Sequence, residues 1–463
     1  MIKKHRSFWF EEAASGIVPC PELVGSQKAD VAIVGGGYVG LWTALNIKKN
    51  DPSCDVVLIE QDICGSGASG KNGGFVLSWW PKISSLTKLC GLENGLAVAR
   101  DSENAISEIR DFCEENKIDA HFRRSPWLWT ATSSVQMNSW DSVLNVCDQL
   151  QVQPFQRLPS NEISKRSGSA VHRAGVIEAS AATIQPAALA FGLRRVALEK
   201  GVRIFENTHM KSFSRTSPVQ IRTTNGTLEA KKMVLATNAW AAAIRELARS
   251  IVAITSDMIV TAPAKEELEK IGWTGGECIT DSQTMVDYYH VTRDHRIAFG
   301  KGGWGIAYGG NLGLDFDRNL QRAKTVEADF RRYYPTLKEI PVTHDWCGPI
   351  DRTPNSLPLL GRFPHQSNII YGVGWSGNGV GPSVIGGKVL ASLALDRQDR
   401  WANYPLVGKS VGLFPPEPIR YIGAHVVRSA VASKERAEIV DLKPSKVSVW
   451  LSSLAPAGLE DKK

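Results

Sequence analysis

Residues 30–40 place a Gly-x-Gly-x-x-Gly turn directly after a short apolar run. Gly35 would make the turn, Gly37 would let the backbone approach a pyrophosphate, and Gly40 would let a strand and a helix pack closely. The free N–H groups at the start of the following helix attract phosphate. The pattern predicts a phosphate-binding turn, although a strand–helix turn that binds nothing can share it.

The flanking residues favour the binding interpretation. Residues 41–47 form an apolar, helix-like segment, and residues 55–60 read as a second buried strand that ends in Glu60. A carboxylate at this distance can accept hydrogen bonds from ribose hydroxyls and disfavours a 2′-phosphate. The segment as a whole therefore predicts a dinucleotide site that does not take NADP.

Two more glycine-rich loops could approach a ligand. Residues 61–74 are dense in glycine and serine, and a loop of this length suits a flavin lying across the sheet better than a nicotinamide. Residues 377–381 read Gly-Asn-Gly-Val-Gly, after an apolar strand at 368–373 and before an apolar helix at 385–395. This second loop also has a packing turn as its alternative.

The composition narrows the class of protein. The chain has 463 residues, 43% hydrophobic and 22% charged, which suits two or three globular domains. Its net charge of +7 without a long basic run leaves an anionic small molecule open and predicts no nucleic-acid partner. Scattered cysteines, an acidic pair near the N-terminus and no long apolar run predict a cytoplasmic protein with no membrane partner, no disulfide frame and no metal site. We expect a monomer or a small homo-oligomer.

Periodicity predicts the elements that must position these loops. Helices are expected at 92–116, 135–150 and 186–200, and strands at 127–131, 202–205 and 233–240. Antiparallel strands, expected at 250–263, 285–289, 296–300 and 343–346, imply a second sheet. Residues 411–463 read as a mixed-charge helical tail.

The order of these motifs resembles the D-amino-acid oxidase family of FAD-dependent amine oxidoreductases. The resemblance also uses residues 236–240, Ala-Thr-Asn-Ala-Trp, and 353–358, Thr-Pro-Asn-Ser-Leu-Pro, and it covers nearly the whole chain. Shorter strings at 78–82, 300–303 and 414–421 are similar to a clade of aminophosphonate oxidoreductases.

The resemblance implies an α/β fold with a doubly wound, Rossmann-like FAD-binding domain and an interleaved antiparallel substrate-binding domain. The FAD-binding domain would comprise residues 28–110, 165–248 and 343–410. The substrate-binding domain would comprise residues 111–164 and 249–342, followed by the tail, 411–463.

The implied reaction is oxidation of an amine by hydride transfer to flavin N5, followed by imine hydrolysis and reoxidation of the flavin by O2, giving H2O2, or by another acceptor. The expected substrate is a primary or N-methyl amine, first of all 2-aminoethylphosphonate, converted to phosphonoacetaldehyde. The FAD is expected to be non-covalent. Its expected contacts are Gly35, Gly37, Tyr38, Val39, Gly40, Glu60, Gln61, Gly67, Ala68, Ser69, Asn72, Gly73, Gly74, Ala236, Thr237, Trp240, Gly348, Gly377, Asn378, Gly379, Val380 and Gly381.

The substrate contacts are predicted from relatives and from charge. The expected catalytic residues are Tyr289, His290 and Lys301, and the expected substrate-binding residues are Trp79, Trp80, Tyr288, Arg293, Arg296 and Lys301. Lys301 is the first choice for a phosphonate, because an anion of that charge needs a cation. Only one of two adjacent strand residues can face the site, so either Tyr288 or Tyr289 belongs to the core. The cations and both tryptophans have solvent-facing or core positions as their alternatives.

Two departures from relatives affect the acceptor and the attachment of FAD. Sarcosine oxidases place a lysine near the flavin for reaction with oxygen, but the corresponding strand here, residues 297–300, contains none. A dehydrogenase therefore stays open. Cys347 lies near a segment where some relatives attach the flavin, but out of their register.

Three rival functions stay open. An oxidase of gamma-glutamylputrescine or another polyamine-like substrate would show carboxylates in the pocket, for which Asp281 and Asp287 are candidates. A flavin-containing protein that modifies nucleic acid would show a continuous basic stripe beside the pocket. A flavin-bound interaction protein without turnover would show a blocked flavin face.

Overall fold

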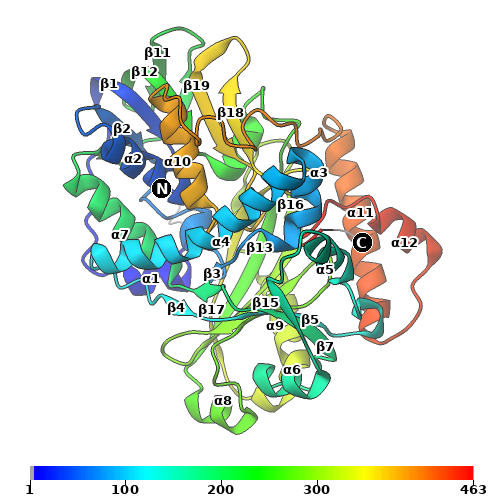
Figure 1. The fold of residues 1–463 in the computed structure, drawn as a ribbon. Coiled ribbons are helices and arrows are strands. Elements are labelled where there is room, and N and C mark those ends of the chain that lie inside the picture. The colour runs from blue at the N-terminus through cyan, green and yellow to red at the C-terminus, as the bar shows by residue number, and fades with distance from the viewer. Residues whose placement is uncertain (1–4, 462–463) are drawn as a thin grey trace.

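The computed structural model describes residues 5–461. Two eight-stranded sheets, one above the other in Figure 1, form its framework, and a small three-stranded sheet lies between them. The strands of the small sheet are β3 (Phe75–Val76), β8 (Ala182–Thr183) and β4 (Arg123–Arg124). Within the described residues, no helix has the length and apolar character needed to cross a membrane.

The first sheet carries the glycine motifs. Its central strand, β1, pairs in parallel with β12 and β2, and β9 and β19 extend the parallel set. The antiparallel strands β10, β11 and β18 complete it. The strands are β1 (Gly25–Val34), β2 (Val56–Ile59), β9 (Arg203–Phe205), β10 (Met210–Phe213), β11 (Val219–Thr223), β12 (Gly226–Leu235), β18 (Leu359–Phe363) and β19 (Gln366–Val373).

Alternation along β1 builds a core on each face of this sheet. Val31 and Ile33 belong to a cluster with α2 (Tyr38–Asn50), α7 (Pro186–Glu199) and α10 (Ser383–Ala394). Ala32 and Val34 face the opposite way, into a second cluster with Val219 of β11. Because both faces are covered, the strand is a continuous apolar run, as is usual for parallel sheets.

The second sheet has the strand order β17-β13-β16-β15-β14-β5-β7-β6, with only β14 and β5 parallel. Helix α9 (Leu320–Tyr333) packs on it through Val326, Phe330 and Tyr333. The strands are β5 (Trp127–Ala131), β6 (Phe155–Leu158), β7 (Ala174–Glu178), β13 (Val252–Thr261), β14 (Cys278–Thr280), β15 (Asp287–Val291), β16 (Ile297–Ile306) and β17 (Val342–Arg352).

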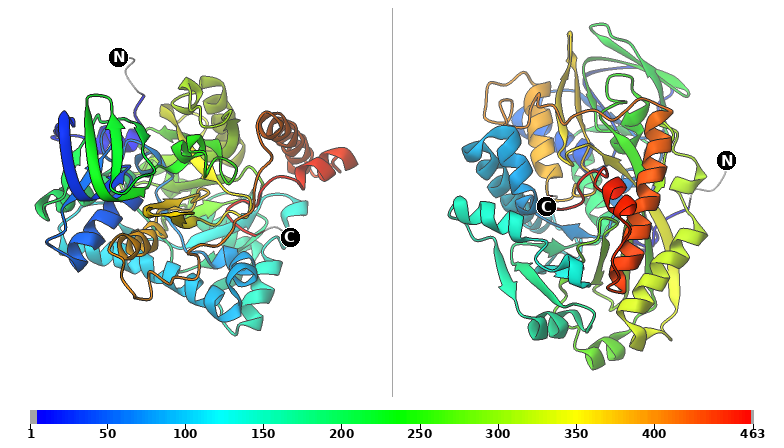
Figure 2. Two further views of the ribbon diagram at one scale, coloured as in Figure 1. Left: turned by 90° about the horizontal axis from the view of Figure 1, so that it is seen from above. Right: turned by 90° about the vertical axis from the view of Figure 1, so that its right-hand side faces the viewer.

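The remaining helices lie around the two sheets. The C-terminal pair, orange to red in Figure 2, packs along one side of the molecule and is followed by a segment that returns to the centre. These helices are α1 (Phe8–Ala13), α3 (Ile83–Cys90), α4 (Leu92–Glu115), α5 (Asp141–Gln149), α6 (Ser160–Ser167), α8 (Lys265–Ile271), α11 (Ile419–Ile439) and α12 (Lys446–Ser452).

The predicted α/β class with an interleaved antiparallel sheet is confirmed. Some boundaries differ from the prediction. The helix expected at 135–150 begins only at Asp141, and the strand expected at 296–300 continues to Ile306. Strands β7 and β17 pair within the second sheet, although the predicted domain limits placed residues 165–248 and 343–410 with the first. Strand propensity does not say which sheet a strand joins, because pairing partners are distant in sequence.

Candidate active site

The Gly35–Gly40 turn lies where β1 ends between β12 and β2. Gly35 has a φ of 112°, and a Cβ there would come within 2.4 Å of the Ala236 carbonyl oxygen. A Cβ on Gly40 would lie 1.9 Å from the Gly35 carbonyl oxygen. Both positions therefore require glycine, as the motif predicts.

Glu60 stands at the end of β2, beside this turn. Its Oε2 accepts a hydrogen bond from the Gly36 N–H at 2.7 Å, and its Oε1 accepts one from the Asp62 N–H at 3.0 Å. Helix α2 begins next to it, after Gly37, which supplies no side-chain cap. The positive end of α2 and an oriented carboxylate thus lie side by side, an arrangement suited to a pyrophosphate and a ribose.

The N-terminal segment forms hydrogen bonds to the backbone of the loop at 61–74. The Ser7 hydroxyl donates to the Gly70 carbonyl at 2.5 Å, and the Trp9 indole donates to the Asn72 carbonyl at 2.9 Å. Trp9 is 2% exposed. Sequence reasoning missed this support, because α1 is short and its partners lie some 60 residues away.

The second glycine loop, residues 374–381, lies at the end of β19 and before α10. Gly377 has a φ of 91°, and the Asn378 side chain donates to the Ser78 carbonyl at 2.8 Å. Asp351 lies beneath the loop and accepts a hydrogen bond from the Gly374 N–H at 2.5 Å. Burial raises the pKa of this carboxyl to about 7, against opposing backbone hydrogen bonds.

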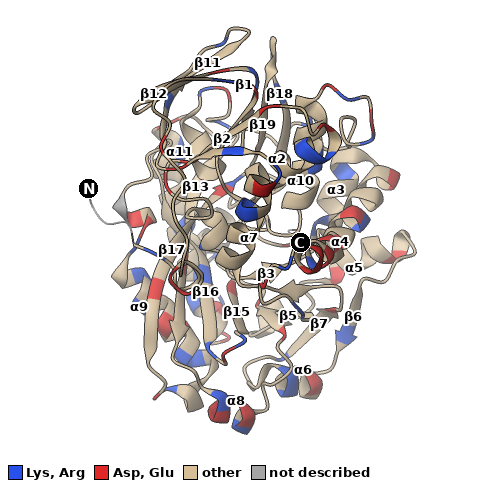
Figure 3. Ribbon diagram, turned by 90° about the vertical axis from the view of Figure 1, so that its left-hand side faces the viewer, with Lys and Arg blue, Asp and Glu red and all other residues tan. Residues whose placement is uncertain are grey.

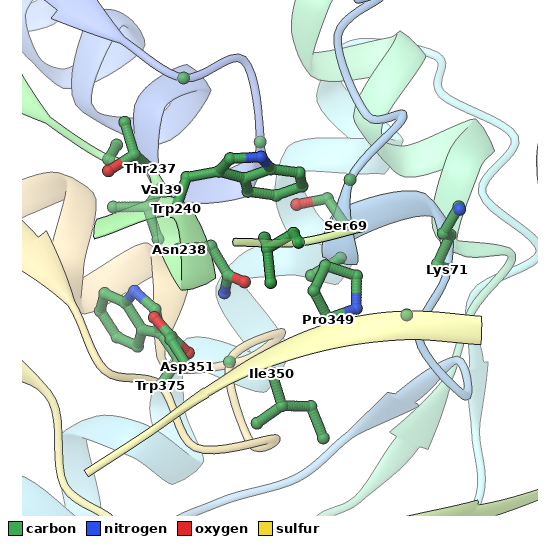
Figure 4. Close-up of a pocket in the computed structure, with 18 of the residues that line it drawn as sticks. Val39, Ser69, Lys71, Thr237, Asn238, Trp240, Pro349, Ile350, Asp351 and Trp375 are labelled. Atoms are coloured by element: carbon green, nitrogen blue, oxygen red, sulfur yellow. The ribbon is translucent and has the colours of Figure 1, made fainter. Parts of the chain in front are cut away.

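A cavity of about 1100 Å³ joins the two loops (Figure 4). Most of the predicted FAD contacts line it: Gly35, Gly37, Tyr38, Val39, Glu60, Gln61, Gly67, Ala68, Ser69, Asn72, Gly73, Ala236, Thr237, Trp240, Gly348, Gly377, Asn378, Gly379 and Val380. The predicted contacts Gly40, Gly74 and Gly381 lie outside the lining. A Cβ on Gly74 would lie 2.6 Å from the Ile184 carbonyl oxygen, and one on Gly381 would lie 2.8 Å from the Leu77 carbonyl oxygen, so these glycines allow close packing instead.

Three buried polar atoms of the lining form no hydrogen bond within residues 5–461. They are the Thr237 hydroxyl, the Asn238 Oδ1 and the Asp351 Oδ1. Buried polar groups are normally hydrogen-bonded, and leaving one unsatisfied costs about 1–3 kcal/mol. A polar cofactor with several donors and acceptors fits a wall of this kind.

The paired tyrosines of β15 face opposite ways. Tyr288 lines the cavity, and its hydroxyl lies 2.7 Å from the Ser256 hydroxyl. Tyr289 is 0% exposed, and its hydroxyl lies 2.7 Å from Nε2 of His172. As predicted, one of the two tyrosines belongs to the core, and Tyr288 is the one that faces the cavity. Tyr289, named as catalytic, is a core residue instead.

His290 also lies outside the cavity lining. Its ring stacks on Trp9 with centroids 6.0 Å apart, and burial lowers its pKa to about 4, so it is neutral at pH 7. The strand brings it under the loop at 61–74, where it would meet a Cβ on Gly74. This position gives it a supporting place rather than the catalytic one that was predicted.

Lys301 does not reach the cavity. Its Nζ lies 2.9 Å from Asp287 and 3.2 Å from Asp329, and its side chain is 4% exposed. Asp281 and Asp287 share hydrogen bonds with Gln283 and Tyr333 in the same buried cluster. The prediction that Lys301 binds the anion is therefore wrong, because its Nζ is already paired with two carboxylates. Asp281 and Asp287 do not form the carboxylates of a polyamine pocket either, because each already has buried partners.

The other predicted substrate contacts lie elsewhere. Arg293 pairs with Asp119 at 3.0 Å on the surface, and Arg296 pairs with Asp294 at 2.6 Å. Trp79 and Trp80 are 1% and 3% exposed and belong to the main core, not to the cavity wall. The structure favours the alternatives to substrate binding: the two arginines form ion pairs outside the cavity, and the two tryptophans are core aromatics.

The structure adds residues that sequence reasoning did not select. Lys71, Asp351, Arg352 and Leu459 all line the cavity. Lys71 lies within the glycine-rich loop at 61–74, and Asp351 and Arg352 directly precede the 353–358 motif, so the sequence could have indicated them by their closeness to these motifs. Leu459 had none, because it comes from the far end of the tail.

Cys347 points away from the cavity. Its thiol is buried beside Arg322 and the Asp315 carbonyl, and burial raises its pKa to about 12. All eight cysteines are unpaired thiols. Within residues 5–461, no cluster of histidine, cysteine and acidic residues has the arrangement of a metal site.

Fold and site together define a dinucleotide-binding oxidoreductase with a cavity shared between two sheets. The chain belongs to the DAO family of FAD-dependent oxidoreductases, whose family model matches residues 30–393. The predicted family and the cofactor FAD are thereby confirmed, as is an oxidoreductase acting on amines or amino acids.

Individual relatives agree with this assignment. Gamma-glutamylputrescine oxidoreductase of Escherichia coli (strain K12) is 28% identical over 410 residues, 87% of this chain and 93% of its own. The beta subunit of sarcosine oxidase from Rhizobium meliloti (strain 1021) is 23% identical over 79% of this chain and 84% of its own. The crystal structure of glycine oxidase from Geobacillus kaustophilus superimposes with a TM-score of 0.67 at 20% identity, covering 82% of this chain and 98% of that one.

Proposed function

We propose that the protein oxidatively deaminates a primary or N-methyl amine, with 2-aminoethylphosphonate as the first candidate substrate and phosphonoacetaldehyde as its product. The observation that carries the proposal is the single cavity, which both glycine loops line and which continues to the face of the second sheet at Ser256, Val286 and Tyr288. A dinucleotide between the loops would leave the sheet face for a small amine.

Bound FAD supplies a two-electron acceptor for the C–N bond of the amine. The chain's own residues orient the substrate and limit the access of water. Phe75, Tyr288 and Trp375 line the cavity, and aromatic rings suit a cationic amine. Burial raises the pKa of Tyr288, so its hydroxyl keeps its proton and can donate a hydrogen bond. Loss of a hydride from carbon and a proton from nitrogen gives an imine, and water converts the imine to aldehyde and ammonia.

A second candidate substrate is gamma-glutamylputrescine. The relative from E. coli that carries this activity in its name is similar along 87% of the chain and supports this candidate. The aminophosphonate candidate rests on shorter strings and on the chemistry of the cavity. Both molecules are amines that also carry an acidic group.

The nucleic-acid and interaction alternatives have less support. On the face shown in Figure 3, lysine and arginine residues are interspersed with aspartate and glutamate residues. The cavity beside the glycine loops has a volume of about 1100 Å³, so the expected flavin face is not blocked. We therefore favour turnover of a small molecule.

Anaerobic bleaching of the flavin by a panel of amines tests the proposal. The panel contains 2-aminoethylphosphonate, its N-methyl form, gamma-glutamylputrescine, glycine and sarcosine. We expect one of the first two to bleach the flavin fastest, with release of ammonia or methylamine. If gamma-glutamylputrescine alone bleaches the flavin, it takes the place of 2-aminoethylphosphonate as the proposed substrate. If no amine of the panel bleaches the flavin, the proposal of amine oxidation is refuted.

The electron acceptor and the attachment of FAD have separate tests. We propose that O2 reoxidises the flavin and gives H2O2. Equal substrate consumption with an artificial acceptor but no H2O2 in air would identify a dehydrogenase. We also propose non-covalent FAD, because the Cys347 thiol lies outside the cavity lining. Yellow colour in the pellet of acid-denatured protein would contradict this.

A further inference from the structure

Some of the cationic side chains that line the cavity form ion pairs with carboxylates, and others do not. Arg6 pairs with Asp62, Lys71 with Asp317 and Arg215 with Glu246, at distances of 2.9, 2.7 and 2.8 Å. Ion pairs of this kind leave little net positive charge for a ligand.

Three further cations line the cavity without such a pair, and they differ in the sheet to which they belong and in their exposure. Lys211 lies on β10 and Arg245 follows β12, both exposed at the first sheet. Arg352 ends β17 in the second sheet and is partly buried. It forms no ion pair with any carboxylate among residues 5–461.

The hydrogen bonds of Arg352 use only one of its nitrogen atoms. Nη1 donates to the Ala457 carbonyl at 2.8 Å and to the Ser356 hydroxyl at 3.2 Å. Nε and Nη2 have no partner within the part of the chain that the structure describes. A guanidinium fork therefore keeps donors available, in the geometry that binds a carboxylate or a phosphonate with two hydrogen bonds.

The C-terminal strap, residues 453–461, holds this arginine in place. Asp461 accepts a hydrogen bond from the Ser85 N–H at 2.9 Å, and Lys82 donates to the Glu460 carbonyl at 2.9 Å. Between these anchors and α12, the strap presents the Ala457 carbonyl to Arg352 and the Leu459 side chain to the cavity. The strap lies beyond residues 30–393, which the family model matches.

Arg352 also carries a charge that burial leaves only partly stabilised. Burial lowers the pKa of Arg352 to about 10, and the charges of Glu460 and Asp351 act in the opposite direction. The side chain therefore stays cationic at pH 7. A partly buried cation that donates no hydrogen bond to a carboxylate is costly, and an anion entering the cavity would offset that cost.

We propose that Arg352, positioned by the C-terminal strap, binds the acidic group of an amine substrate. This inference rests on the proposed function and narrows it to amines that carry a carboxylate or a phosphonate. Arg352 takes the place that the sequence had suggested for Lys301. Leu459 closes the same end of the cavity and limits the length of the substrate.

Three amines of equal length test the proposal on the holoenzyme. They are 2-aminoethylphosphonate, its carboxylate counterpart 3-aminopropanoate, and uncharged propylamine. Replacing Arg352 by glutamine is expected to raise KM for the preferred acidic amine by about 30-fold or more, because a charged hydrogen-bonded pair is lost. KM for propylamine should change less than about threefold. Preference for the phosphonate or for the carboxylate in the wild-type enzyme identifies the acid.

A binding measurement that needs no turnover accompanies the kinetics. Ethylphosphonate and propanoate lack the amine, so they can bind but cannot be oxidised. At least one should perturb the flavin absorbance saturably in the wild-type protein and not in Arg352→Gln. The surface variant Arg110→Gln, in which a pair with Asp111 at 2.6 Å is lost, should behave as wild type.

Asp461→Ala tests the role of the strap. Asp461 touches neither the cavity nor Arg352, so a loosened strap should raise KM for the acidic amine while kcat and flavin content change little. Unchanged KM in Asp461→Ala would remove the strap from the proposal.

Other outcomes overturn the inference and leave the proposed function standing. An equal loss of activity toward all three amines in Arg352→Gln would do so. A shifted flavin reduction potential with unchanged KM would assign the arginine to the cofactor instead. If no amine bleaches the wild-type flavin, the proposed function itself fails.

Discussion

Lys301 shows how burial decides what a single cation can do. The residue has a charge and a position on the expected strand, yet Asp287 and Asp329 lie 2.9 and 3.2 Å from its Nζ. A cation that is paired inside the protein is not available to a ligand, and removing it leaves its partners buried and uncompensated. Arg352, with unpartnered donors at the cavity, is the opposite case.

Replacing Lys301 by methionine should therefore destabilise the protein and leave substrate choice unchanged. Removing one partner of a buried ion pair costs about 3–5 kcal/mol, because the other charges stay buried. Chemical denaturation measures the loss, and KM ratios among the three amines check the selectivity. The exposed pair of Lys28 and Glu229 provides the control, because Lys28→Met should cost about 1 kcal/mol or less. A changed KM ratio in Lys301→Met would return the lysine to the substrate site.

Asp351 predicts a pH dependence of stability. Its pKa is about 7 in the folded protein and 3.8 without burial, so the folded state binds the proton more tightly. The contribution of this proton to stability is complete below about pH 4 and is lost as the pH rises to about 7.

The isosteric variant Asp351→Asn lacks this titration. Between pH 4 and 8, the melting temperature of flavin-free wild-type protein should fall relative to that of Asp351→Asn, by at least about 2 °C. Parallel profiles for the two proteins would show that the carboxyl ionises normally.

At the scale of elements, β15 separates function from packing through its alternation. Tyr288 contributes its hydroxyl to the cavity beside Ser256, and Tyr289 stacks on Phe299 with ring centroids 4.7 Å apart. Successive side chains of a strand point to opposite faces, so neighbouring tyrosines have different consequences when they are changed.

Tyr288→Phe should reduce kcat/KM for the amine about tenfold, because a hydrogen bond to the substrate is lost, while stability changes little. Tyr289→Ala should cost about 3–5 kcal/mol of stability, as expected for a large aromatic removed from a core. Steady-state kinetics and chemical denaturation separate the two effects. Reversed results would mean that the strand faces the other way.

At the scale of the whole molecule, the cofactor site depends on contacts between distant parts of the chain. Helix α1 supports the loop at 61–74, and the Trp9 indole donates to the Asn72 carbonyl at 2.9 Å. The C-terminal strap contacts the cavity lining through Arg352 and contributes Leu459 to it. Both ends of the described chain thus meet the same cavity.

Trp9→Ala should weaken FAD binding, because the loop loses a buried hydrogen bond and an aromatic support. We expect the flavin dissociation constant to rise about tenfold or more, measured by fluorescence of the released flavin. Trp450, 64% exposed on α12, provides the matched control, and Trp450→Ala should retain wild-type affinity. Equal flavin affinity in both variants would show that α1 does not support the loop.

The sequence by itself determined the local features of this protein. The Gly35–Gly40 turn, Glu60 and the loop at 377–381 were recognisable because their function depends on backbone conformation and short spacing. The parallel and antiparallel sheets followed from apolar runs and their alternation. FAD and the family came from the order of these motifs.

Only the tertiary structure decided which side chains meet at the cavity. Tyr288 and Tyr289 are equivalent in the sequence until a sheet face is buried, and Lys301 is an ordinary cation until Asp287 and Asp329 surround it. Arg352 and Leu459 are about 100 residues apart and meet only because the tail folds back. Such contacts depend on packing between elements far apart in the chain, which short-range periodicity does not encode.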